Sequence, residues 1–115
     1  MEIEKIKNDI FENNFQIINC DINGKVTESS NSIFEINIDK DISEYLPILS
    51  DLENYVEYSE KNPFRFYALE IDYGETIYCD LTGYNSGGSF FIILQNLTQH
   101  YKELKSIQQK LNNTL

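Results

Sequence analysis

The sequence contains one histidine, one arginine, two cysteines and no tryptophan. With His100 as the only imidazole, no pairing of a histidine with a serine or cysteine nucleophile can be assembled away from the C-terminal segment. A single arginine and a formal net charge of −10 argue against nucleic-acid binding, which requires Lys and Arg to neutralise phosphates. We therefore expect neither an enzyme nor a partner made of nucleic acid.

Long apolar runs are also missing from the chain. No window approaches 18 consecutive apolar residues, so we expect no membrane insertion. The N-terminal stretch MEIEKIKNDIF mixes acids with bases and lacks the apolar core of a secretory leader. Cys20 and Cys79 lie far apart and form no CxxC motif, which favours two free buried thiols in a cytoplasmic protein over a disulfide.

The hydrophobic pattern of the 115 residues predicts one α+β domain. Ile3, Ile6 and Ile10 recur at helical spacing, so residues 1–12 are predicted to form an amphipathic helix that flanks the domain. The continuous apolar run from Phe90 to Leu94 predicts a strand over residues 89–95 that is buried on both faces. Apolar residues between turn signals predict strands over 15–20 and 25–29, and alternation of apolar and polar residues predicts strands over 64–72 and 76–84. In the third strand, this alternation places Arg65, Tyr67, Leu69 and Ile71 on one side.

Between the second and third strands the pattern is helical but interrupted. Ser30-Asn31-Ser32 offers caps for one short helical turn, and Pro47 breaks the stripe that follows into short helices. The whole order fits a five-stranded antiparallel sheet with small helices on one face and flanking N- and C-terminal helices.

This order, together with particular residues, resembles the PAS sensory domain over about residues 13–115. The hairpin IINCDINGKV is similar to the opening PAS hairpin, with Asp21 and Gly24 in a DxxG turn, and Asn31 matches the residue that commonly starts the next small helix. QNLTQHYKEL at 95–104 resembles the D-I-T-E-R-K segment that ends many PAS domains, although Asn96 stands where the family has an acid. The resemblance implies a flanking helix at 1–12, a PAS-like domain at 13–96 and a connector helix at 97–115.

The function that this resemblance implies is a cytoplasmic sensory and dimerisation module, which relays a signal to an effector domain of the histidine kinase or cyclase type. A small apolar ligand would lie between the sheet and the small helices, or the same side chains would simply fill the core. The candidates to line that site are Ile18, Phe34, Leu46, Leu49, Tyr67, Tyr78 and Phe91. Haem is disfavoured, because haem-binding PAS domains take their axial histidine from the middle helices and residues 31–62 contain no histidine. Flavin is disfavoured, because flavin photosensors of the LOV type need a cysteine within GxNCRFLQ and neither cysteine lies in that motif.

The C-terminal helix is predicted to pass the signal to the effector domain. Asn96 and Thr98 are expected to cap it and to relay movement of the last strand, with Gln99 returning a hydrogen bond to the cap. Its apolar stripe predicts the seam of a homodimer, with Leu97, Leu104 and Leu111 at one heptad position. The predicted seam residues are Ile3, Ile6 and Ile10 of the N-terminal helix and Leu97, Tyr101, Leu104, Ile107 and Leu111 of the C-terminal helix.

Three other interpretations remain open. A ligand-free PAS-like adaptor that only pairs chains is the alternative function. Glu70, Asp72 and Asp80 could act as carboxylates in acid–base catalysis, but their positions near turns favour exposed surface acids. Asp39, Asp41 and Glu44 could suggest a calcium site, but their stretch lacks the glycine of a calcium-binding loop, so a solvated acidic patch is favoured and no metal is expected.

Overall fold

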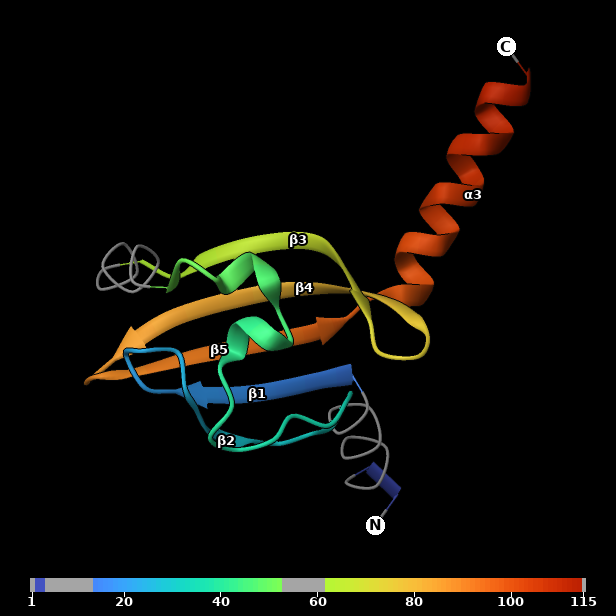
Figure 1. Ribbon diagram of the computed structural model, residues 1–115. Coiled ribbons are helices and arrows are strands. Elements are labelled where there is room, and N and C mark those ends of the chain that lie inside the picture. Colours follow the sequence, from blue (N-terminus) through green and yellow to red (C-terminus); the bar gives the residue numbers. More distant parts are fainter. Residues whose placement is uncertain (1, 4–13, 53–61, 115) are drawn as a thin grey trace.

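Residues 2–3, 14–52 and 62–114 are described by the computed structural model shown in Figure 1. The strands are β1 (Phe15–Cys20), β2 (Val26–Ser29), β3 (Phe64–Asp72), β4 (Thr76–Ser86) and β5 (Ser89–Asn96). They form one antiparallel sheet in the order β2-β1-β5-β4-β3, and helix α3 (Thr98–Thr114) follows β5. The predicted α+β class, the five-stranded antiparallel sheet and the C-terminal helix are confirmed. The predicted N-terminal helix lies outside the described residues apart from Glu2 and Ile3.

The β1–β2 hairpin closes through the turn that the DxxG pattern predicts. One carboxylate oxygen of Asp21 accepts hydrogen bonds from the amides of Asn23 (2.9 Å) and Lys25 (3.0 Å). Gly24 has φ +90°, and a Cβ at this position would lie 3.3 Å from a methyl carbon of Leu52. Glycine therefore serves both the backbone conformation and the close packing of this turn.

The helical turn predicted after Asn31 is wrong, because residues 32–34 form a bend and residues 35–37 have no regular secondary structure. The amides of Ile33 and Phe34 donate to the side-chain oxygen of Gln16 on β1, at 3.0 and 2.9 Å. The amide of Ile36 donates to the side-chain oxygen of Asn31, whose φ is 51°. Since these amides bond to side chains, they are not available to form a helix.

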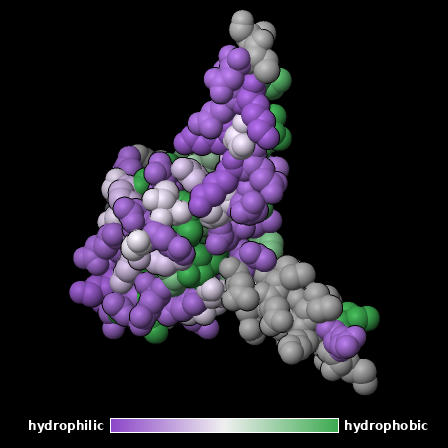
Figure 2. All heavy atoms as spheres, turned by 90° about the vertical axis from the view of Figure 1, so that its right-hand side faces the viewer, coloured by the Kyte–Doolittle hydropathy of each residue, from purple (hydrophilic) through white to green (hydrophobic). Residues whose placement is uncertain are grey.

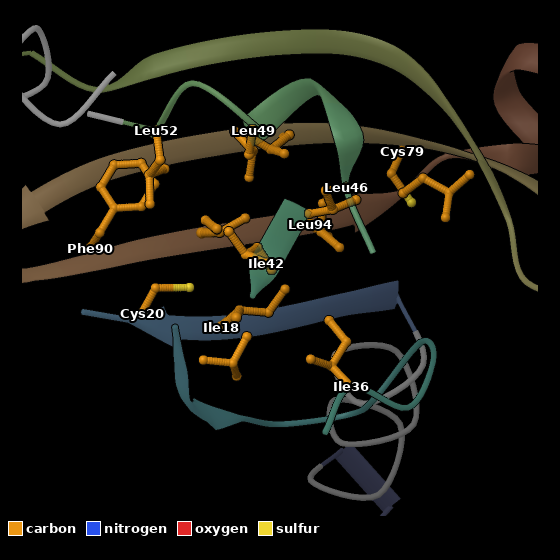
Figure 3. Close-up of a cluster of buried hydrophobic side chains, with 14 of the residues drawn as sticks. Ile18, Cys20, Ile36, Ile42, Leu46, Leu49, Leu52, Cys79, Phe90 and Leu94 are labelled. Atoms are coloured by element: carbon orange, nitrogen blue, oxygen red, sulfur yellow. The ribbon is translucent and has the colours of Figure 1, made fainter. Parts of the chain in front are cut away.

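Two short 3-10 helices follow, η1 (Ile42–Glu44) and η2 (Pro47–Leu49). Asp41 caps η1 by accepting from the amide of Ser43 at 2.9 Å, and η2 begins at Pro47, as the interruption of the stripe predicted. Ile42, Leu46 and Leu49 of this segment are buried, and Figure 3 shows them among the side chains of the sheet. These apolar side chains hold the segment against the strands.

The buried side of the sheet follows the predicted alternation on β4, whereas the prediction that β5 is buried on both faces is wrong, because only one of its faces is fully buried. Ile77, Cys79 and Leu81 are buried on β4, and Phe90, Ile92 and Leu94 are buried on β5, where Phe91 and Ile93 are half-buried. Phe64 of β3 and Phe90 stack at a centroid distance of 5.6 Å over Gly83. A Cβ on Gly83 would lie 2.5 Å from the Phe64 ring, so only glycine allows this packing.

A bulge in β3 changes its alternation. The register moves from Phe66 opposite Leu81 to Leu69 opposite Cys79, so Tyr67 and Ala68 together oppose the single residue Asp80. Ala68 has φ 54°, in the left-handed region. The prediction that Arg65, Tyr67, Leu69 and Ile71 share one side is therefore wrong: Tyr67 is 67% exposed, whereas Ile71 after the bulge is buried.

Candidate functional site

The junction between β5 and α3 is the first part of the candidate site, because a single residue, Leu97, joins the two elements. The amide of Leu97 donates to the carbonyl of Tyr78 on β4 at 2.9 Å. Its carbonyl accepts from the amide of Tyr101 at 3.0 Å, which closes the first turn of the helix. The start of α3 is therefore bonded directly to the neighbouring strand.

The predicted cap residues Asn96 and Thr98 act together at this junction. The side-chain oxygen of Asn96 accepts from the amide of Thr98 at 3.1 Å and also from its hydroxyl. The hydroxyl oxygen of Thr98 in turn accepts from the amide of Tyr78 at 3.0 Å. Gln99 does not return a bond to the cap as predicted; its side chain donates to Glu103 at 3.1 Å, one helical turn further on.

Asp80 of β4 connects the helix to the bulge of β3. The hydroxyl of Tyr101 donates to one carboxylate oxygen of Asp80 at 2.7 Å, and the amide of Ala68 donates to the same oxygen at 3.0 Å. The hydrogen bond to Asp80 is the main cause that raises the pKa of Tyr101 above its usual value of 10.0, with burial and the charge of Asp80 adding to it. Sequence reasoning missed this link, because it depends on the bulge.

The predicted seam residues of α3 lie at two depths. Leu97 and Tyr101 are half-buried, whereas residues 102–113 are exposed throughout. Leu104, Ile107 and Leu111 are 42%, 54% and 58% exposed. Figure 1 shows α3 projecting away from the sheet, and Figure 2 shows hydrophobic atoms along one edge of it. In the N-terminal part of the predicted seam, Ile3 is exposed, and Ile6 and Ile10 lie outside the described residues.

The residues predicted to line a ligand site fall into two groups. The structure brings four of them into the buried core: Ile18, Phe34, Leu46 and Leu49. The other three lie outside that core. Tyr78 packs against Tyr101 at a ring distance of 6.4 Å, Phe91 stacks on Tyr84 at 5.4 Å, and Tyr67 is largely exposed.

A groove lies where the two 3-10 helices meet β3. It consists of two adjoining hollows of about 430 and 290 Å³, which share Glu44, Tyr45, Ile71 and Asp72. Glu70 and Asp72, two of the acids considered for catalysis, line the larger hollow, whereas Asp80 lines neither hollow. The three predicted carboxylates are thus not brought together in this groove.

Burial keeps the two thiols protonated at neutral pH. Cys20 and Cys79 are free and buried, as predicted, and burial raises their pKa to about 12 and about 11. His100 is exposed on α3, beside the ring of Tyr101 at 5.4 Å. Within residues 2–3, 14–52 and 62–114, no group of three or more His, Cys, Asp or Glu is placed to hold a metal ion.

No known protein family matches this chain, and a search of curated proteins finds no similar one. Among the helices that the structure describes, none is long and apolar enough to cross a membrane.

Proposed function

We propose that this chain is a cytoplasmic PAS-type sensory and dimerisation module of a two-component system, whose helix α3 passes a signal to an effector of the histidine kinase or cyclase type. In this proposal the short helices cover one face of a PAS-like sheet. The observation that carries the proposal is the junction of β5 and α3. One residue joins them, and hydrogen bonds through Thr98 and Tyr101 tie the first turn to β4.

Such a junction transmits movement from the sheet to α3, because the single linking residue cannot absorb a shift of the strands. A change in the twist or register of β4 moves Tyr78 and Asp80, and both are bonded to the first turn of α3. The helix then rotates or tilts as a body, since its backbone hydrogen bonds keep it rigid over 17 residues. Two arrangements of the sheet would thus become two orientations of the helix.

The exposed stripe of α3 is the surface that pairs with a second copy. Leu104, Ile107 and Leu111 are each about half exposed, so completing their burial contributes about 1 kcal/mol per side chain. Two chains supply six such side chains, or about 6 kcal/mol, which is close to the lower end of the 4–15 kcal/mol that association costs. We therefore expect a dimer that dissociates on dilution unless the N-terminal isoleucines add to the seam.

A ligand-free adaptor that only pairs chains is the second candidate. It is favoured by the burial of Ile18, Leu46 and Leu49, which are at most 2% exposed and pack in the core. The two candidates share the paired helices and differ in whether a ligand alters their pairing.

The test of pairing is sedimentation equilibrium of the wild-type chain and of the variant Leu104→Gln/Leu111→Gln. The wild type should show a concentration-dependent dimer, and the variant should remain a folded monomer at every concentration. The matched control is Lys102→Ala/Gln109→Ala, which changes two exposed residues on the opposite side of the helix and should leave the dimer intact. A variant that dimerises as the wild type does would remove the basis of the proposal.

A further inference from the structure

The groove beside β3 has a polarity that sets it apart from a simple apolar cleft. Ile48 and Leu69 supply accessible apolar surface in the larger hollow, whereas four carboxylates line the two hollows: Glu35, Glu44, Glu70 and Asp72. Among residues 2–3, 14–52 and 62–114, no lysine, arginine or histidine lines either hollow. The groove therefore combines an apolar surface with acids of a single sign of charge.

These four carboxylates have no cationic partner among the described residues. The ion pair that the described residues form joins Lys25 to Asp39 at 3.9 Å, away from the groove. The four acids also do not converge on a point, since no metal-holding group of side chains occurs in the described part of the chain. A compact ion such as Mg²⁺ or Ca²⁺ needs several oxygens around one centre, so it fits this groove poorly.

Aromatic rings gather at the smaller hollow. Phe34 stacks on Tyr73 at a centroid distance of 5.5 Å and faces Tyr45 at 6.5 Å, and all three line this hollow. Aromatic faces attract ammonium groups, and nearby carboxylates add a separate Coulomb attraction. The rings, the acids and the apolar surface together match a cation that carries its charge on an aliphatic skeleton.

We propose that this groove binds a small aliphatic organic cation, an amine or quaternary ammonium compound whose alkyl part lies along Ile48 and Leu69. The two hollows, of about 430 and 290 Å³, lie in the range of small-molecule sites. Because the groove has two adjoining hollows, a diamine or polyamine places one ammonium group in each hollow. This binding stands by itself, whereas its role as the signal received by the module rests on the function proposed above.

The groove adjoins the link between β3 and the helix. Leu69, which lines the larger hollow, directly follows Ala68 of the bulge. The amide of Ala68 and the hydroxyl of Tyr101 share the same oxygen of Asp80. A ligand that draws β3 toward the 3-10 helices therefore acts on Leu69, one residue away from the connection to α3. Binding in the groove can in this way change the orientation of α3.

Isothermal titration calorimetry of the full chain at low ionic strength tests the proposal, with spermidine and choline as probes. We expect one spermidine per chain with a dissociation constant below about 1 mM. Glu44→Gln/Asp72→Asn should weaken spermidine at least tenfold. Tyr73→Leu, at an exposed ring, should weaken choline more than spermidine. The matched control Glu28→Gln/Glu103→Gln makes the same change in net charge away from the groove and should bind spermidine as the wild type does.

Three results would overturn the proposal. One is the absence of binding to the wild type. Another is an equal loss in the control, which would mean diffuse attraction to an acidic surface. The third is a tetralysine peptide that binds tenfold more tightly than spermidine, which would make the groove a peptide site. Because these titrations do not require pairing, groove binding by a chain that stays monomeric would uphold the site and contradict the dimerisation module.

Discussion

Replacing Tyr101 by phenylalanine tests the connection between the sheet and α3 with the removal of one oxygen atom. The substitution keeps the ring against Tyr78 but removes the 2.7 Å hydrogen bond to Asp80. Hydrogen bonds to charged groups contribute about 1.5–3 kcal/mol. Tyr101 is only half-buried and Asp80 keeps the amide of Ala68, so the expected loss is smaller than that of a fully buried hydrogen bond to a charged group.

Urea unfolding measures this loss, and hydrogen exchange locates it. The free energy of unfolding should fall by more than it does in the control below, and exchange of the Leu97 and Tyr101 amides should accelerate in step with that fall. Tyr84→Phe is the matched control, because within the described residues the Tyr84 hydroxyl has no hydrogen bond and its ring stacks on Phe91. It should change stability by less than about 0.5 kcal/mol.

The pH dependence of the same pair supplies a second check. Because the folded state raises the pKa of Tyr101, its contribution is complete below pH 10.0 and is lost as the pH rises through the raised value. The difference in stability between the wild type and Tyr101→Phe should therefore be constant near neutral pH and decline above 10.0. If Tyr101→Phe is as stable as the wild type, or if its exchange is faster everywhere except in the first turn of α3, the reasoning about this junction is refuted.

Two further predictions concern the interior of the domain. Gln16→Leu should lower the free energy of unfolding by about 3 kcal/mol in urea, because it leaves the amides of Ile33 and Phe34 without their acceptor; a loss below about 1 kcal/mol would contradict the role of Gln16. Stability should also fall as the pH rises from 9.0 toward about 11 and about 12, because unfolded thiols ionise there while buried Cys79 and Cys20 stay protonated. Cys20→Ala/Cys79→Ala should show a shallower decline in alkaline urea titrations, and an unchanged slope would be evidence against buried neutral thiols.

The strands could be predicted from the sequence because their alternation reports which side chains leave water. Ile77, Cys79 and Leu81 alternate with polar residues and occupy the buried face as expected. The interruption at Pro47 was equally visible, since proline lacks an amide hydrogen and starts η2.

The features that shape the candidate site depend on contacts between distant residues. Nothing about alanine indicates a left-handed conformation, so the bulge at Ala68 and the sharing of Asp80 with Tyr101 could not be read from the chain. Gln16 likewise appeared as an ordinary strand residue, although its side chain holds the segment around Ile33 and prevents a helix there. The groove also escaped prediction, because it forms only when η1 and η2 pack beside β3.

The most direct test of the paired helices is disulfide cross-linking of single cysteines placed on α3. Buried Cys20 and Cys79 have raised pKa values and should stay unreactive in the folded protein. The native cysteines should therefore form no disulfide-linked dimers of their own. In a parallel pair of helices, residues at the same heptad position of the seam face each other. We predict that Leu104→Cys forms disulfide-linked dimers in high yield under mild oxidation, while Lys102→Cys on the opposite side forms few. Equal yields at the two positions, or no dimer at Leu104→Cys, would contradict the proposal that α3 is the dimer seam.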